Sequence, residues 1–445
     1  MKVSQLLLFG ILLIGISASA QQTNLSLNEA VSIALSKSDE VNLANTKVET
    51  RNYDLQTVKN NQYPDVKISG QYLRLTNADV NLKSSQEANA DPDAEPAASP
   101  KVNQLILGQA NVSMPIFSGF KLKNSIKASE NLYKAEQSNA EHSKEQIAMR
   151  VVQFYADLYK VQQSVGLFKE SLKSGQQRVT DFQAMEKNGL IARNDLLKAQ
   201  LQLSRYQLSL DEAEKNVRLI NYQLVTLLKL PAETQIVVSP DNIDKDLFSR
   251  TVKTEAEALQ ARKDLESLGF SKEAAEANLK VAKSNYFPAF SLVGGYAFLD
   301  VQNVVRVENA MNVGVGLSYN LSSIFKNDKE VKAAKSRALE VETQRLILTD
   351  RIKTEIVSAR EDYDLSLKQD KVYTEAVAQA DENYRIVKDK YDNGLSDTND
   401  LLEADVEDLS AKINQAYAKA NVVLKYYELL DVSGQLTQSF NLTKN

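Results

Sequence analysis

Side chains that could do covalent or metal chemistry are scarce in this chain of 445 residues. It contains no Cys, which excludes disulfides, thiolate metal sites and Cys nucleophiles. The single His, His142, argues against a His-based catalytic or metal centre, and we interpret it as a surface or helix-seam residue. No GxSxG, HExxH, Walker or CxxC motif occurs. We therefore expect neither an enzyme nor a cofactor, and the net charge of −5 argues against a nucleic-acid partner.

One pair of acidic residues has a spacing that could bind ions. Asp400 and Glu403 are three residues apart in a segment expected to be helical, so both carboxylates lie on one helix face. On a charge-rich helix, two such acids are ordinarily solvated. Several copies around a narrow axis would instead form a ring that attracts cations, disfavours anions and can hold a polyvalent cation. The elements that position this segment decide between the two.

Those elements occur twice in the chain. Residues 188–199 read NGLIARNDLLKA and residues 393–404 read NGLSDTNDLLEA, with eight of twelve positions identical. Such self-similarity indicates an internal duplication. The Asn-Gly pair in each copy predicts a sharp turn between two helices, because both residues tolerate the left-handed conformation at a helix C-terminus. We place the first repeat at 21–230, a connector at 231–250, the second repeat at 251–433 and a polar tail at 434–445.

Each repeat shows two strand-like runs followed by two long helices. The strands are expected at about 66–75, 105–117, 290–299 and 309–321. The helices are expected at about 121–187, 194–230, 324–391 and 397–430. Apolar residues recur in the helices at spacings of three and four, which predicts antiparallel coiled-coil packing. The acidic, Pro-rich segment 76–101 between the first two strands is expected to be a long solvated loop.

The N-terminal residues 1–20 have the layout of a secretory signal peptide. Lys2 precedes an apolar run, and Ala18-Ser19-Ala20 provides a small-residue cleavage pattern. No other stretch offers eighteen apolar residues, so any membrane crossing must use strands. The run at 309–321 alternates apolar with small or polar residues, which fits both a soluble sandwich and a lipid-facing strand. The signal peptide and the long helices favour the membrane.

Four strands cannot close on themselves in a membrane, where the smallest barrels have about 8. An open sheet would leave backbone groups unsatisfied in lipid, at several kcal/mol each. Membrane insertion therefore requires an oligomer, and the residues alone do not choose between two chains with eight strands and three chains with twelve.

These features resemble the TolC-like outer membrane efflux protein family. The resemblance rests on the signal peptide, the duplication, the paired strands before each helical hairpin and the turn motif YDNGLSDTNDLLEAD at 391–405. It implies a mainly α fold with a small membrane β component: a homotrimer whose 12-stranded β-barrel in outer-membrane lipid continues into a periplasmic α-helical tunnel. It also implies the passive exit duct of a tripartite efflux system, opened by a periplasmic adaptor and driven by an inner-membrane pump.

The resemblance gives the acidic pair a role. Two aspartates ring the periplasmic constriction in this family, and their matches here are Asp400 and Glu403, so one aspartate is replaced by Glu. Tyr391 matches a gate tyrosine. Ser396 stands where the family has a gate arginine, so the link that holds the gate closed is expected to differ.

The corresponding positions in the first copy are Asp195 and Lys198. Their opposite charges predict that only the second copy can form the acidic ring, which is also the possible metal-binding ring. By the same resemblance, the helix tips are expected to dock the adaptor, although Gly and Leu there could serve only the turn and a small packing contact. The tip residues are Asn188, Gly189, Leu190, Asn393, Gly394 and Leu395.

The alternative function is a periplasmic coiled-coil adaptor or spacer without a channel of its own. Adaptors usually have one helical hairpin flanked by compact β-domains, together with an inner-membrane anchor. Two hairpins, each preceded by strands, favour the exit duct. The residues do not indicate the transported substrate.

Overall fold

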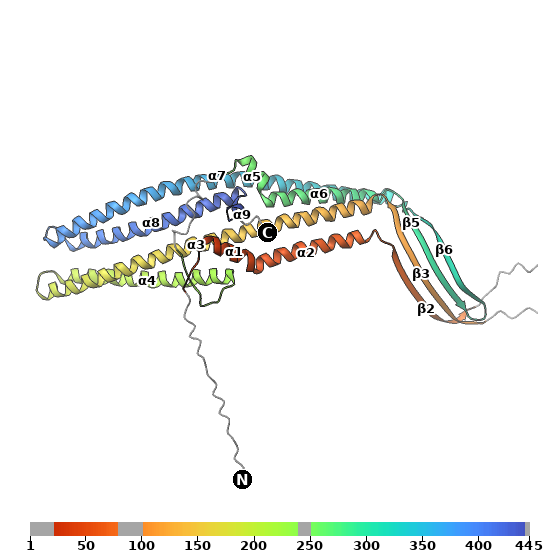
Figure 1. The fold of residues 1–445 in the computed structure, drawn as a ribbon, viewed down its shortest axis with the longest axis horizontal. Coiled ribbons are helices and arrows are strands. Elements are labelled where there is room, and N and C mark those ends of the chain that lie inside the picture. The colour runs from red at the N-terminus through yellow and green to blue at the C-terminus, as the bar shows by residue number, and fades with distance from the viewer. Residues whose placement is uncertain (1–21, 79–100, 239–250, 441–445) are drawn as a thin grey trace, which may run out of the picture. The chain divides into compact units, whose positions relative to one another are not determined.

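The computed structural model describes residues 22–78, 101–238 and 251–440 (Figure 1). The expected signal peptide lies outside these residues, as do most of the segment 76–101 and part of the connector. The described chain consists mainly of long helical hairpins, together with paired strands, and this confirms the expected fold class. Within the described residues, every helix lacks the apolar stretch that a membrane-crossing helix needs.

The elements follow the same order in both copies. The first copy comprises β1 (Gln22–Asn24), α1 (Leu27–Lys37), α2 (Asp39–Asn60), β2 (Asp65–Ala78), β3 (Val102–Ser118), α3 (Lys121–Lys187) and α4 (Arg193–Leu228). After β4 (Gln235–Val237), the second comprises α5 (Glu255–Ala261), α6 (Lys263–Ser284), β5 (Ala289–Val301), β6 (Val305–Ser318), α7 (Ser323–Asp392), α8 (Thr398–Val432) and α9 (Leu436–Ser439).

Both copies begin with the same helix start. Ser26 caps α1 and Thr254 caps α5, and each side chain accepts a hydrogen bond from the backbone N–H three residues later. In turn, the carboxylates of Glu29 and Glu257 accept a hydrogen bond from the backbone N–H of the capping residue. This reciprocal arrangement satisfies two backbone donors at the helix N-terminus. Its repetition supports the duplication.

The four long strands form one antiparallel sheet in the order β2-β3-β5-β6. Within the described chain, β2 and β6 have no strand on their outer side. Strand β6 ends three residues earlier than expected, because Asn320 forms a turn through hydrogen bonds to Ser322 and Ser323 that starts α7. One face of β6 exposes large apolar side chains, among them Val313 at 83%.

The described chain divides into two compact units. Of the described residues, unit 1 combines 22–46, 139–238, 251–265 and 348–440, and unit 2 combines 47–78, 101–138 and 266–347. Unit 2 holds the four-stranded sheet and the adjoining helix segments. Unit 1 holds most of both helical hairpins and the small parallel sheet of β1 and β4. Each unit contains segments of both repeats, so the compact units do not coincide with the repeats in the sequence.

The core of unit 1 joins the expected helix seams. Ile147 and Leu158 of α3, Leu224 of α4 and Leu430 of α8 are fully buried in one cluster. The C-terminal residues differ from the polar tail expected from the sequence. Leu436 of α9 is fully buried, and the ring of Phe440 stacks on Tyr427 at 5.2 Å. Leu436 and Phe440 are four residues apart, which places both on one side of this short helix and lets them extend the core.

Candidate functional site

The two hairpin turns have the same geometry. In the first copy, Gly189 has φ 73° and Leu190 donates its N–H to the carbonyl of Met185 at 2.9 Å. In the second, Gly394 has φ 72° and Leu395 donates to Lys390 at 2.8 Å. This pattern satisfies the last carbonyls of a helix around a left-handed residue.

The asparagines before these glycines stabilise the same turns. The Nδ2 of Asn188 donates to the carbonyl of Ala184 at 2.8 Å, and the Nδ2 of Asn393 donates to Asp389 at 2.7 Å. The leucines contribute little packing, since Leu190 is 70% exposed and Leu395 is 78% exposed. Asn and Gly therefore make the turns, and the leucine side chains are not needed for them.

The acidic pair lies just after the second turn. Asp397 caps α8 by accepting hydrogen bonds from the N–H groups of Asn399 and Asp400. The side chains of Asp400 and Glu403 are both exposed in the single chain. Ser396 donates its hydroxyl to the carboxylate of Asp400 at 2.7 Å. The residue at the family's arginine position thus bonds within its own hairpin rather than to another helix.

Tyr391 packs against the first-copy hairpin. Its ring stacks on that of Phe182 at 5.8 Å between centroids. Its hydroxyl is buried and has no hydrogen-bond partner within the described residues. A buried donor without a partner is destabilising, so this contact is held by ring packing.

The first-copy counterparts of the acidic pair bind each other. Lys198 Nζ lies 3.6 Å from the carboxylate of Asp195. The first-copy position therefore carries an ion pair, whereas Asp400 and Glu403 have no cation beside them in the described chain.

A small apolar cluster joins the two hairpins near their tips. It contains Val179 and Phe182 of α3, Ala199 of α4 and Leu401 of α8, with Tyr384 and Tyr391 of α7 against it. All four long helices therefore contribute to one packed group. A groove of about 580 Å³ between α3 and α7 lies beside it and is lined by residues including Tyr391.

A buried ion pair lies next to this cluster. Arg178 of α3 donates two hydrogen bonds, each 2.9 Å long, to the carboxylate of Asp405 of α8. The side chains are only 10% and 13% exposed. The hydroxyl of Tyr206 of α4 donates to Asp405 at 2.6 Å, and Arg178 also donates to the hydroxyl of Tyr384 of α7 at 3.1 Å. We call these four residues the tip network.

Electrostatics strengthens the tip network. Burial lowers the pKa of the Arg178 guanidinium, but the Asp405 carboxylate more than offsets this, so the pKa is raised. Burial and the same carboxylate raise the pKa of Tyr206. Arg178 therefore stays charged and Tyr206 stays a hydrogen-bond donor across ordinary pH.

The tip network was not predicted from the sequence. Tyr206 and Tyr384 lie in the apolar seams predicted from helix spacing. Arg178 and Asp405 are 227 residues apart, and the duplication maps neither onto the other. The only signal in the sequence was a charged residue next to an apolar seam position in each helix: Arg178 before Val179, and Asp405 before Val406.

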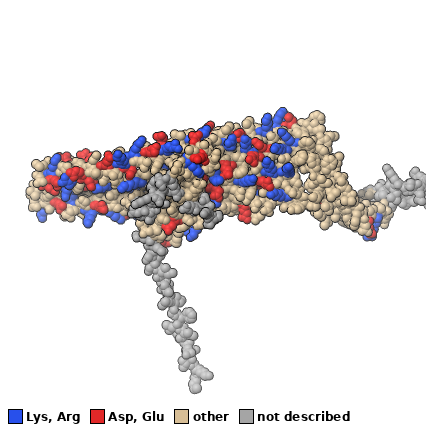
Figure 2. All heavy atoms as spheres, turned by 45° about the horizontal axis from the view of Figure 1, so that its top comes forward, with Lys and Arg blue, Asp and Glu red and all other residues tan. Residues whose placement is uncertain are grey.

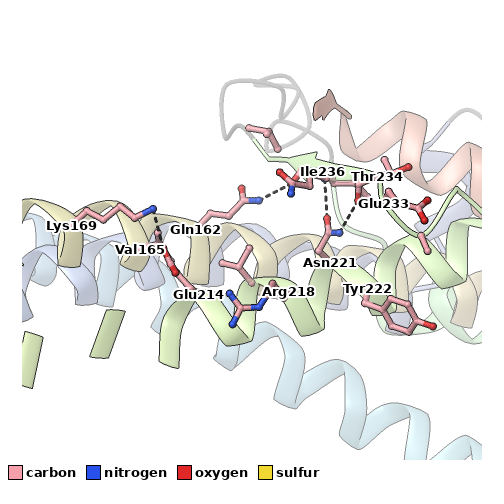
Figure 3. A pocket seen from close by; sticks show the side chains of 14 residues that line it. Gln162, Val165, Lys169, Glu214, Arg218, Asn221, Tyr222, Glu233, Thr234 and Ile236 are labelled. Atoms are coloured by element: carbon pink, nitrogen blue, oxygen red, sulfur yellow. Dashed lines mark hydrogen bonds and ion pairs between the residues drawn. The ribbon is translucent and has the colours of Figure 1, made fainter. Parts of the chain in front are cut away.

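A second hollow of about 800 Å³ lies away from the tips, between α3, α4 and β4 (Figure 3). The side-chain amide of Asn221 donates to the carbonyl of Thr234 and accepts from the N–H of Ile236, while Gln162 donates to the carbonyl of Ile236. Its charged residues include the ion pair of Lys169 with Glu214. The hydrogen bonds of Asn221 and Gln162 thus hold β4 in place. No residue of the acidic pair lines this hollow.

Among the described residues, no group of three or more His, Asp and Glu side chains could hold a metal ion. His142 is half-buried on α3, with Nδ1 3.8 Å from the carboxylate of Glu145.

Comparison with known proteins follows the same division into copies. The sequence model of the family described as "Outer membrane efflux protein" matches residues 30–228 and 256–435, one stretch in each repeat. The chain is 20% identical over 324 residues to the outer membrane efflux protein BepC of Brucella suis, covering 72% of this chain and 70% of that protein. It is 24% identical over 331 residues to the toxin and drug export protein A of Aggregatibacter actinomycetemcomitans, covering 71% and 70%.

Solved structures show the same fold. The outer membrane protein VceC of Vibrio cholerae superimposes with a TM-score of 0.78 at 16% identity, covering 92% of this chain and 96% of that one. The family match spans most of both repeats and decides against the adaptor alternative. The chain belongs to the outer membrane efflux protein family and is a TolC-like, non-enzymatic efflux channel of the outer membrane.

Proposed function

We propose that three copies of this chain assemble into the exit duct of a tripartite efflux system. The observation that carries this proposal is the incomplete sheet: within the described part of the chain, β2 and β6 are unpaired on their outer sides. An unpaired edge in lipid is costly, and a neighbouring copy can supply the missing partner. Channels of this family are trimeric, which gives twelve strands.

The α7–α8 hairpin would form the gate at the periplasmic end of this duct. Asp400 and Glu403 are exposed and have no cation beside them in the described chain. Three copies would bring six carboxylates around one axis, which favours cations and can hold a polyvalent cation. Tyr391 would hold this hairpin against Phe182 in the closed state.

The tip network would provide the link that holds the gate closed. Asp405 of α8 accepts hydrogen bonds from Arg178 of α3 and Tyr206 of α4, and Arg178 also donates to Tyr384 of α7, so both helices of each hairpin take part. Moving the second hairpin away from the first would break its charged hydrogen bonds. This would replace the link that the family's arginine would make, since Ser396 bonds to Asp400 within its own hairpin.

The exposed leucines at the two turns would dock a periplasmic adaptor, which in turn connects the duct to an inner-membrane pump. Leu190 and Leu395 are mostly exposed although the turns do not need them. Exposed apolar side chains at a rigid turn are suitable anchors for a partner helix.

Block by a trivalent cation tests the acidic ring. Single-channel conductance of purified trimers in a planar bilayer should fall when the hexaammine cobalt(III) ion is added to the periplasmic side. Asp400→Asn/Glu403→Gln trimers should keep their conductance, because the ring has lost its charge. Asp195→Asn/Lys198→Gln is the matched control and should be blocked like the native protein. Equal block of all three proteins would remove the ring assignment.

A further inference from the structure

Unit 2 contains a cleft of about 840 Å³ where β3 ends and α3 begins. Its lining includes Lys123, Lys127 and Asn131 of α3 and Ile116 at the end of β3, together with Phe120 between the two elements. Neither the gate nor the adaptor-docking tips involve these residues. The cleft therefore needs its own explanation.

The lysines in this cleft lack a counter-charge. Lys123 and Lys127 are exposed and one turn apart, and neither has an ion-pair or hydrogen-bond partner in the described part of the chain. The first turn of α3 has no acidic residue. A helix N-terminus already carries partial positive charge, so lysines there are unfavourable until an anion binds.

Asn131 supplies an independent indication of a ligand. Its side chain is 4% exposed, lines the cleft, and its Nδ2 has no hydrogen-bond partner within the described residues. Buried donors in proteins are nearly always paired. An acceptor oxygen bound in the cleft would satisfy this donor.

The acidic residues of the cleft do not cancel its charge. Glu130 is neutralised by Lys59, whose Nζ lies 3.0 Å from its carboxylate. Glu273 is the other acid in the lining, against Lys123, Lys127 and Lys134. The unpaired charge among the described lining residues is therefore positive.

The apolar part of the lining favours a lipid over a free anion as the ligand. Ile116 and Phe120 are 63% and 60% exposed beside the lysines. Figure 2 shows few charged side chains along most of the length of the strands of unit 2, while charged side chains of both signs cover the helices next to them. A phospholipid combines a phosphate with acyl chains and so matches both parts, whereas inorganic phosphate matches only one.

We propose that this cleft binds the phosphate headgroup of an anionic membrane phospholipid, with its acyl chains against Ile116 and Phe120. The proposal rests on the proposed function in one respect, since it takes the strands of unit 2 to lie in the membrane. Lys123 and Lys127 would pair with the phosphate, and Asn131 would donate to a phosphate or ester oxygen.

Native mass spectrometry of the full-length protein in detergent tests this binding. Dioleoyl phosphatidylglycerol should bind to each protomer, and dioleoyl phosphatidylcholine should bind much more weakly. Lys123→Gln/Lys127→Gln should weaken phosphatidylglycerol binding about tenfold or more, because each lysine near a lipid phosphate contributes to the attraction. Lys368→Gln/Lys371→Gln removes the same charge from exposed positions of α7 that have no ion-pair partner among the described residues, and this variant should bind the lipid normally.

Asn131→Leu provides a second variant with an opposite signature. Without a ligand, replacing an unsatisfied donor by an apolar side chain should leave the melting temperature unchanged or higher. With the ligand, the same variant should bind phosphatidylglycerol several-fold more weakly. The melting temperature and the lipid affinity of this variant therefore separate a binding role from a structural one.

Three results would overturn the proposal. Equal binding of the two lipids would show that the headgroup charge is not recognised. Unchanged binding in the lysine variant would move the lipid elsewhere. Displacement of phosphatidylglycerol by millimolar inorganic phosphate would assign the cleft to a free anion. Failure of the native protein to form channels in bilayers would instead contradict the proposed function, because binding in detergent needs no channel.

Discussion

At the residue scale, the tip network places the charged groups of Arg178 and Asp405 where water can hardly solvate them. Removing one partner of a buried ion pair leaves the other charge uncompensated. Arg178 would be left in this position if Asp405 lost its charge, because no other carboxylate of the described residues bonds to it. The two hairpins would then lose their strongest polar link near the tips.

Asp405→Asn should therefore open the gate. We expect the resting single-channel conductance to rise severalfold and the free energy of unfolding to fall by about 3 kcal/mol. The charge-exchanged pair Arg178→Asp/Asp405→Arg should restore the native conductance. Bilayer recordings and thermal unfolding of the purified protein measure the two effects.

Glu382→Gln is the matched control for this prediction. Glu382 accepts two hydrogen bonds from Arg385, at 2.8 and 2.7 Å, but this pair is exposed and lies within α7 alone. Its loss should leave the conductance unchanged, since exposed pairs contribute little. Native conductance in Asp405→Asn would rule out the tip network as the link.

Asp431 of α8 lies in a second charged group, far along the chain from the tips. Burial and the charge of Glu145 raise its pKa to about 7, although Arg262 and His142 oppose this. Arg262 is held by Asp264 at 2.6 Å and by Glu355 at 3.3 Å. Asp431 is therefore half-protonated in the folded protein near neutral pH.

The stability of the protein should consequently depend on this carboxyl. The pKa of this carboxyl is about 7 in the folded chain and has its ordinary value of 3.8 in the unfolded chain, so stability falls as pH rises between these values. Asp431→Asn should raise the free energy of unfolding at pH 8 by about 1 kcal/mol or more. The gain should shrink towards pH 5. Thermal unfolding at both pH values measures it, and an equal gain at both would contradict the raised pKa.

At the element scale, the hairpin turns show how one motif can have two purposes. The Asn-Gly pair closes each turn, and the leucine that follows remains exposed. Gly394 is a poor position for testing docking, because its φ of 72° would strain any other residue. Leu395 can be changed without touching the turn geometry.

Leu395→Asp should abolish export while leaving heat-resistant trimers intact. The variant loses the apolar contact that the Leu395 side chain would make with the adaptor. For a side chain at the centre of an interface, this loss costs about 2 kcal/mol or more of binding free energy. Leu395→Met keeps the volume and apolar character and should export normally. Cross-linking to the adaptor in intact cells measures docking, and native cross-linking of the Asp variant would contradict it.

At the scale of the whole molecule, the exposed apolar face of β6 decides where the protein resides. Val313 faces the same side as Met311, Val315 and Leu317, whereas Asn312 faces the other. A lysine on the lipid-facing side costs about 2–4 kcal/mol at mid-membrane depth. Val313→Lys should sharply reduce the amount of protein in the outer-membrane fraction, and Asn312→Lys should not. Equal amounts of the two variants in this fraction would show that the Val313 side of β6 does not contact lipid.

Much of this architecture was predictable because it is local. The long helices and both turns follow from neighbouring residues: apolar spacing of three and four, and Asn-Gly at a helix end. The duplication follows from the direct repeat of residues 188–199 at 393–404. The end of β6 was placed too late, because the turn made by Asn320 depends on side-chain hydrogen bonds that periodicity does not reveal. The acidic pair at Asp400 and Glu403 came from spacing and resemblance, and its ring remains a prediction.

The sequence by itself determined which segments form helices, strands and turns, since those preferences act over a few residues. Only the tertiary structure decided which distant segments meet. The relative phase of two supercoiled hairpins brings Arg178 to Asp405, and it is not encoded near either residue. Leu436 and Phe440 are a second example. Their neighbours in the sequence are mostly polar, so the sequence did not predict that both side chains pack into the core of unit 1.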